Sequence, residues 1–502
     1  MPAPAPLLHR SACGLLLLAC AAVLLGSRLI AASALQRFDQ PRTVSYTADI
    51  VLNGRWLIPR DFTGQTTTKP PLVNWLAAPV VALGFWTEWA VKWPMAAATL
   101  GTTALTFFIA RRLFRRMAET RAVATEAACI AGLAWLVNTA NVTMIYHCRP
   151  DPVLTAFLTA AWILGTMVIT EEASPAWPII LSFWVCVGLA ALTKGPAALV
   201  PVIYLVLAAW LIGKRPALVH RSRWWWGLPL ALALFLCWAI PAATRYPDAF
   251  FNVLVKQQLL APALGMGDRF GNAGLANEGP GAIITHIPQN PIWFMQRFAP
   301  WSLLTFGALC VIRPRDWFRH PLAPAVLWLL LVLAFFSLSA RKTADYILPA
   351  YPAAAVLASY FAATFLQRWR IRLWHLGSVG VLLAIGFGLH AGFLSKTARH
   401  YGFALRQFAD QVAPVIGQEP VIFVETGFNT LEFYLHRHQP GPATADEIAQ
   451  AQWVIMPVQP GVSAALVSEP LLVRPTHPSR LALYRADYVR DRLVAKAPAA
   501  VH

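Results

Sequence analysis

Long apolar stretches constrain this chain more than any other feature of its sequence. Stretches of roughly 18 to 22 apolar residues recur between residues 12 and 394, and each is long enough to cross about 30 Å of hydrocarbon as a helix. Only 13% of the 502 residues are charged, while 57% are hydrophobic, which leaves too few charges to cover a water-soluble globule of this length. We therefore predict a polytopic membrane protein whose membrane part is an all-α bundle.

The apolar stretches predict about eleven transmembrane helices within residues 1–394, with about 13 as the upper bound. Two long segments, 35–89 and 244–292, interrupt the series on one side of the membrane, and loops of this length are usually functional or disordered. Short apolar pieces in the first segment, such as 72–83, predict helices that lie on the membrane interface. The predicted spans are 12–34, 90–110, 124–145, 152–170, 177–193, 197–212, 224–243, 293–312, 322–340, 346–366 and 372–394.

Basic residues between the spans predict the orientation of the chain. The 41 lysines and arginines exceed the 23 acidic residues by 18, but they lie in short groups, as the positive-inside rule expects of cytoplasmic loops. This scatter argues against a nucleic-acid partner. We expect a multi-pass protein of a bacterial inner membrane, with a cytoplasmic N-terminus and an extracytoplasmic C-terminus. The groups are Arg111/Arg112/Arg115/Arg116, Lys214/Arg215/Arg221/Arg223, Arg313/Arg315/Arg319 and Arg368/Arg370/Arg372.

After residue 395 the composition changes to that of a soluble domain. Short runs with strand character lie at 421–424, 453–456, 471–473 and 481–484, and residues 430–436 have helical character. Residues 395–502 are therefore expected to form a small periplasmic α/β domain.

Ionisable residues gather at the outer ends of the predicted spans, where charges are costly and are functional candidates. Two carboxylates with several cations suit transfer from a phosphate-linked donor. A carboxylate can activate an acceptor hydroxyl, and cations can stabilise the charge that grows on a leaving phosphate. The residues are Asp39, Arg42, Lys69, Arg149, Asp151, Lys342 and Asp345.

Five ordered motifs resemble the lipid A aminoarabinose transferases and the dolichyl-phosphate-mannose protein mannosyltransferases. The resemblance covers about 315 residues and implies a C-type glycosyltransferase membrane fold and a polyprenyl-phosphate-sugar donor. The motifs are Asp39-Gln40-Pro41-Arg42 with Asn53-Gly54-Arg55-Trp56, Lys69-Pro70-Pro71-Leu72, Arg149-Pro150-Asp151, Thr193-Lys194-Gly195-Pro196, and the segment from Ser339 to Pro352.

The resemblance also implies roles by position. Asp39 and Asp151 would be the catalytic carboxylates, and Arg42 and Lys194 would support them. The residues that would bind the donor phosphate are Lys69, Arg149, Lys342 and Tyr346.

The chain departs from the aminoarabinose enzymes at several acidic or aromatic positions. Gln40 and Ser45 replace glutamates, Thr43 replaces a tyrosine, and Thr68 replaces the glutamate before the lysine. These changes leave the sugar open. They also leave open whether a divalent metal takes part, so we assign no metal ligand and no cofactor.

Simpler roles for the same residues stay open. Asp39 could cap an interfacial helix and pair with Arg42, and Lys69 could be a snorkelling anchor. Arg149 and Asp151 could form an ordinary loop ion pair, and Lys194 could hold a tight turn.

The function that we predict is transfer of a sugar, with inversion, to lipid A, another glycolipid or a protein. A transporter or flippase of lipid-linked sugars is the alternative, although transporters usually carry their ionisable residues near the midplane and show internal repeats. An assembly factor that acts through the outer domain is a third reading.

Overall fold

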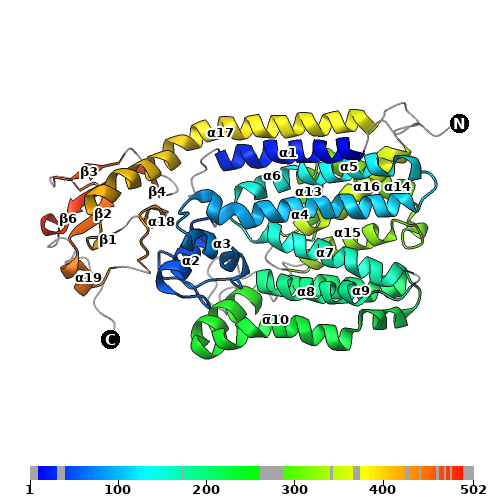
Figure 1. Ribbon diagram of the computed structural model, residues 1–502, viewed down its shortest axis with the longest axis horizontal. Helices are drawn as coiled ribbons and strands as arrows, with labels where there is room; N and C mark the ends of the chain where they lie inside the picture. The colour runs from blue at the N-terminus through cyan, green and yellow to red at the C-terminus, as the bar shows by residue number, and fades with distance from the viewer. Residues whose placement is uncertain are drawn as a thin grey trace.

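The computed structural model describes residues 10–30, 40–171, 173–260, 287–339, 343–365, 373–424, 430–439, 443–459, 463–468, 471–474 and 477–489. Within these ranges, long helices lie side by side in a bundle, and a small α/β unit lies beyond one end of it (Figure 1). The predicted all-α bundle is therefore present, with a separate C-terminal unit that contains the strands.

The bundle helices are rich in alanine, glycine and threonine where they meet. Helix α16 contributes alanines that are fully buried, and small residues allow neighbouring helices to approach closely inside a membrane. Larger side chains fill the remaining space: the rings of Trp162 and Trp328 stack with centroids 5.8 Å apart. The helices are α1 (Arg10–Ile30), α4 (Glu88–Arg115), α5 (Ala124–Leu136), α6 (Thr139–Tyr146), α7 (Asp151–Thr170), α8 (Trp177–Lys194), α9 (Leu199–Leu211), α10 (Trp224–Arg245), α13 (Gln289–Arg297), α14 (Trp301–Val311), α15 (Ala323–Ser337) and α16 (Tyr351–Thr364).

Among the described residues, 4 helical stretches are long and apolar enough to cross a membrane: Glu88–Arg115, Asp151–Thr170, Trp177–Leu211 and Trp224–Arg245. The third stretch contains both α8 and α9, which meet at Gly195, where φ is +52°. Several other predicted spans contain shorter apolar stretches of 10–17 residues within the described ranges, so the number of spans stays a prediction.

Two predicted spans are interrupted rather than continuous. The stretch 124–145 divides into α5 and α6 at Asn138, whose side chain accepts a hydrogen bond of 2.9 Å from the Asn141 amide and so caps α6. The stretch 293–312 divides between α13 and α14, and Pro300 directly precedes α14. Proline suits a helix start because its missing N–H would have no helical partner there.

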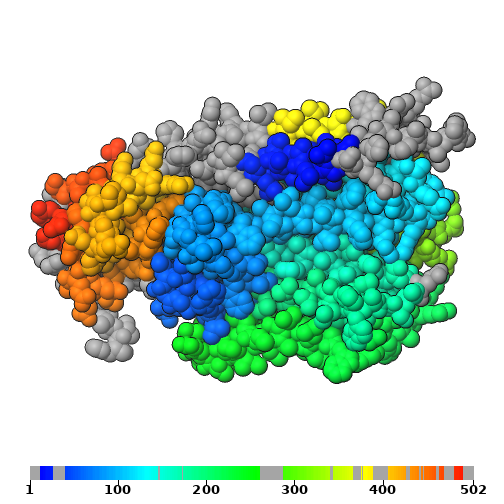
Figure 2. All heavy atoms as spheres, viewed as in Figure 1, coloured from blue at the N-terminus to red at the C-terminus, as the bar shows by residue number. Residues whose placement is uncertain are grey.

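The first outer segment forms two short helices, α2 (Gln40–Asn53) and α3 (Leu72–Ala82). They lie between the bundle and the C-terminal unit (Figures 1 and 2). Helix α3 confirms the helix predicted at 72–83, whereas a helix at the position of α2 was predicted only as one of the alternatives for Asp39. Nine residues of α2 are buried, and several of them are polar. The sequence of α2 therefore lacks the continuous apolar face by which a helix is usually predicted.

The C-terminal unit begins inside a helix rather than after one. Helix α17 (Leu373–Ile416) continues through residue 395, where we predict the domain boundary. The four predicted strands and the helix at 430–436 are all found. The elements are β1 (Val421–Phe423), α18 (Leu431–Tyr434), α19 (Ala445–Gln450), β2 (Trp453–Pro457), β3 (Leu466–Val467), β4 (Leu471–Arg474), β5 (His477–Ser479) and β6 (Leu481–Arg485).

Four of these strands form a sheet in the order β1-β2-β6-β3. Strands β1 and β2 are parallel, while β6 is antiparallel to both of its neighbours. Apolar side chains of β2 and β6 are buried on both faces. This unit also contacts the outer segment. The Tyr434 hydroxyl donates to Glu88 Oε1 at 2.7 Å, and His438 Nε2 lies 3.1 Å from the Arg60 carbonyl oxygen.

Candidate active site

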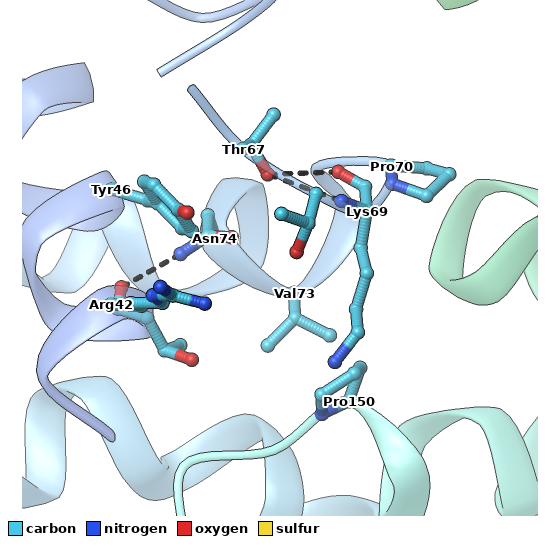
Figure 3. Close-up of a pocket in the computed structure, with 10 residues that line it drawn as sticks. Arg42, Tyr46, Thr67, Lys69, Pro70, Val73, Asn74 and Pro150 are labelled. Carbon is cyan, nitrogen blue, oxygen red and sulfur yellow. Dashed lines mark hydrogen bonds between the residues drawn. The ribbon is translucent and has the colours of Figure 1, made fainter. Parts of the chain in front are cut away.

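A cation-lined pocket lies between α2, the loop before α3, and the start of α7 (Figure 3). Its volume of about 60 Å³ is several times what a single water molecule needs. Arg42 and Lys69 supply its positive charge, and the side chain of Lys69 extends across it toward Pro150. The lining residues are Arg42, Thr43, Tyr46, Thr67, Thr68, Lys69, Pro70, Val73, Asn74 and Pro150. This pocket is therefore suited to an anion, and we call it the Lys69 pocket.

Local hydrogen bonds fix the loop that carries Lys69. The Thr67 hydroxyl donates to the Lys69 carbonyl oxygen at 2.9 Å, and the Thr67 amide donates to the Pro59 carbonyl oxygen at 2.9 Å. On the opposite wall, the Asn74 amide group donates to the Thr43 carbonyl oxygen at 2.8 Å. Among the residues that the structure describes, the Lys69 ammonium forms no ion pair, but it acts electrostatically on Asp151.

Beside this pocket, Asp151 is buried at the first turn of α7. The Lys194 ammonium donates to Asp151 Oδ1 at 2.5 Å, and the two side chains are 13% and 5% exposed. The same ammonium lies 3.7 Å from the centroid of the Tyr346 ring, a geometry that favours cation–π attraction. Lys69 and Arg149 also act electrostatically on Asp151. Three predicted site residues from distant parts of the sequence thus form one contact cluster.

A second buried carboxylate, Asp345, lies one residue before Tyr346 and contacts Arg149. Arg149 and Arg297 both form ion pairs with Asp345, one with each carboxylate oxygen. Arg149 and Asp151 thus each form an ion pair with a residue from a distant part of the sequence, Arg149 with Asp345 and Asp151 with Lys194. Sequence reasoning missed Arg297, which ends α13 and gave no sign except its position at the end of an apolar stretch.

Two further buried carboxylates support the outer segment, and the sequence gave no motif for either. Asp61 lies 3.6 Å from the Arg42 guanidinium and accepts from the Thr63 and Gln65 amides. Asp49 accepts from Arg55 at 3.1 Å. These carboxylates hold the chain that forms the Lys69 pocket.

Two predicted site residues, Asp39 and Lys342, lie outside the described residues, and their roles stay predictions. Gln40, which follows Asp39, is fully buried, and neither polar atom of its side chain has a partner within the described structure. A buried amide without partners is costly, so this position favours a polar ligand.

The described residues do not fit a resident metal ion. No group of three histidine, cysteine, aspartate or glutamate side chains in the described ranges could hold one. In the Lys69 pocket, Thr68 stands where the resemblance has a glutamate, and the charged groups that line the pocket are cations. We therefore derive no step through a metal.

Several known proteins resemble this chain in sequence. Residues 68–240 match the family model for dolichyl-phosphate-mannose-protein mannosyltransferase. The undecaprenyl phosphate-alpha-4-amino-4-deoxy-L-arabinose arabinosyl transferase of Aeromonas hydrophila is 25% identical over 363 residues, which cover 69% of this chain and 60% of that protein. The protein of the same name from Shewanella sediminis is 26% identical, with coverage of 66% and 56%. The chain thus spans less than two thirds of the length of these relatives.

Solved structures share the fold. ArnT from Cupriavidus metallidurans bound to undecaprenyl phosphate superposes with a TM-score of 0.69 at 17% identity, and the match covers 93% of this chain and 97% of that one. An apo oligosaccharyltransferase from Archaeoglobus fulgidus has a TM-score of 0.52 at 11% identity, with coverage of 89% and 69%. The family match and the relatives show that this chain resembles the ArnT proteins and the dolichyl-phosphate-mannose protein mannosyltransferases in sequence, and it shares the membrane fold of the solved ArnT structure.

Proposed function

We propose that this protein is a glycosyltransferase that takes a sugar from a polyprenyl-phosphate donor at the outer face of a bacterial inner membrane. The observation that carries the proposal is the Lys69 pocket, a small anion-binding space directly beside the buried Asp151–Lys194–Tyr346 cluster. The relatives named for undecaprenyl phosphate-linked aminoarabinose support the choice of donor class.

In this proposal the donor phosphate lies against Lys69 and Arg42. Negative charge grows on that phosphate as the bond to the sugar breaks, and fixed cations in a partly buried pocket stabilise it. Arg149 would add positive charge beside the start of α7, and Tyr346 would contact the phosphate from the α16 side. Lys342 keeps the phosphate-binding role that the resemblance implies.

Asp39 would act as the base. Its carboxylate would accept the proton of the acceptor hydroxyl while that oxygen attacks the anomeric carbon and the phosphate departs from the opposite face. This single displacement inverts the anomeric centre. Asp151 would keep Lys194 charged and oriented at the edge of the pocket.

The acceptor in this proposal is lipid A, another glycolipid or a protein. The transporter alternative is weaker because the ionisable cluster lies at the ends of α7 and α8 rather than at their centres, whereas transporters usually bind substrate near the midplane.

The test is an assay on the purified full chain in nanodiscs with an undecaprenyl-phosphate-linked sugar and envelope lipids. We expect release of undecaprenyl phosphate together with a glycosylated acceptor or, in the absence of acceptor, slow release of free sugar. Passage of the intact donor lipid between leaflets without cleavage would support the transporter instead.

A further inference from the structure

A second cation-lined pocket lies on the other side of the segment that carries Lys69. It is open, has a volume of about 530 Å³, and lies between the turn at residues 60–66 and the end of α10. Its lining includes Arg60, Thr66, Arg245, Tyr246, Asp248 and Asn252. We call it the Arg245 pocket.

The position of the Arg245 pocket favours access from the lipid bilayer. Arg245 is the last residue of α10, and α10 is the least buried of the candidate spans, with 28% of its apolar window buried against 50% or more in the others. In Figure 2 this helix lies along one edge of the molecule. The end of a lipid-exposed span lies at the level of the lipid headgroups.

The second cation, Arg60, is held in place by its backbone. Its amide donates to Asp49 Oδ2 at 2.7 Å, and its carbonyl oxygen contacts His438 Nε2 at 3.1 Å. Its exposed guanidinium forms no ion pair with a described residue.

The two pockets share a wall. Thr66 lines the Arg245 pocket and the adjacent Thr67 lines the Lys69 pocket. The Tyr46 hydroxyl, on the Lys69 side, donates to the Thr66 carbonyl oxygen at 3.4 Å. A ligand in the Arg245 pocket would therefore lie next to a ligand in the Lys69 pocket.

We propose that the Arg245 pocket binds the phosphate of a lipid headgroup other than the donor. The two guanidiniums match a phosphate in charge and hydrogen-bonding geometry. Asp248 would repel a bare anion, but together with Asn252 it can accept from and orient the hydroxyls of a headgroup. The proposal rests on the proposed function only in treating the Lys69 pocket as the donor's site.

The test is a crossed binding experiment on the full chain in detergent, read by native mass spectrometry. Dioleoyl phosphatidylglycerol, a phosphodiester with free hydroxyls, probes the Arg245 pocket, and undecaprenyl phosphate probes the Lys69 pocket. The variants are Arg60→Gln, Arg245→Gln and Lys69→Gln. Arg215→Gln removes an exposed arginine elsewhere and is the matched control. Because Arg60 and Arg245 are also exposed, their variants should fold, which size-exclusion chromatography checks.

We expect Arg60→Gln and Arg245→Gln each to weaken phosphatidylglycerol binding on the order of tenfold, since each removes one charge-assisted contact. Lys69→Gln should instead weaken the binding of undecaprenyl phosphate. The proposal is overturned if the arginine variants weaken the binding of undecaprenyl phosphate only, or if their affinity for phosphatidylglycerol equals that of Arg215→Gln. It is also overturned if inorganic phosphate displaces phosphatidylglycerol completely. A Lys69→Gln variant without effect on undecaprenyl phosphate would count against the donor site and not against this pocket.

Discussion

The ammonium of Lys194 donates to the Asp151 carboxylate at 2.5 Å, and this pair joins the end of α8 to the first turn of α7. Both side chains are largely buried. Removal of one partner from such a pair leaves a buried charge without compensation, which typically costs about 3 to 5 kcal/mol. We therefore predict that Lys194→Met lowers the thermal unfolding temperature of the purified protein.

The matched control is the double variant Asp151→Asn/Lys194→Met, in which both charges are gone. It should recover most of the lost stability but no transfer activity if Asp151 is essential for chemistry. A double variant as unstable as the single one would mean that Lys194 acts through packing on Tyr346 and not through its charge.

The second prediction concerns Lys69. Lys69→Gln keeps the length and polarity of the side chain but removes its charge. A charge-assisted hydrogen bond contributes about 1.5 to 3 kcal/mol, so the affinity for undecaprenyl phosphate should fall by tenfold or more. Titration followed by native mass spectrometry measures the change, with Lys214→Gln as an exposed control. Unchanged affinity would assign Lys69 to interfacial anchoring.

Asp151 could be predicted as a site residue because it lies at the end of an apolar stretch, where a charge is conspicuous. Lys194 and Tyr346 were predicted from the family resemblance only, and their contact with one another was not. Four strands and one helix of the C-terminal unit could likewise be predicted from short apolar runs, whereas α19, β3 and β5 were missed. The order of the strands in the sheet could not be predicted, because strand pairing between β2 and β6 depends on contacts that no local pattern encodes.

The supports of the outer segment could not be predicted for a similar reason. Asp49 lies in α2 and Asp61 in the loop that follows it, both among polar residues. Asp49 is buried against His438, which comes from the far end of the chain. The break at Asn138 was missed because apolar residues continue on both sides of it. Only the capping hydrogen bond to Asn141 shows where the helix stops.

The third prediction is the membrane orientation. The four basic groups predict a cytoplasmic N-terminus and an extracytoplasmic C-terminus. A C-terminal alkaline phosphatase fusion should therefore be active, while a fluorescent protein that folds only in the cytoplasm should be dark at the same position. An inactive phosphatase fusion together with a bright fluorescent protein fusion at the same position would place the Lys69 pocket on the cytoplasmic face instead.

The fourth prediction concerns Asp39, which the resemblance makes the catalytic base. Asp39→Asn preserves the shape of the side chain but removes the base, so transfer should fall by on the order of 10² to 10⁴. Binding of undecaprenyl phosphate should persist. Asp410→Asn, an exposed change in α17, is the control. Near wild-type transfer by the Asp39 variant would leave Asp151 as the candidate base.

The last prediction concerns the contact between the C-terminal unit and the outer segment at low pH. Burial lowers the pKa of His438 below its usual value, and the attraction of Asp49, 3.5 Å away, only partly opposes this. Asp49 already accepts from Asn53 and Arg55, which weakens its pull on a proton. His438 is therefore neutral in the docked state and protonates more readily when it is exposed.

The contact between the C-terminal unit and the outer segment is therefore strongest above the ordinary histidine pKa of about 6.5. It weakens as the pH falls below that value, because protons then bind preferentially to the state in which the contact is broken. Each pH unit below that value costs at most about 1.4 kcal/mol for one such group. We predict that the wild-type chain loses more thermal stability between about pH 7.5 and about pH 5.5 than His438→Asn does. The Asn variant has no titrating ring at this contact, so an equal loss in both proteins would show that other groups set the pH dependence.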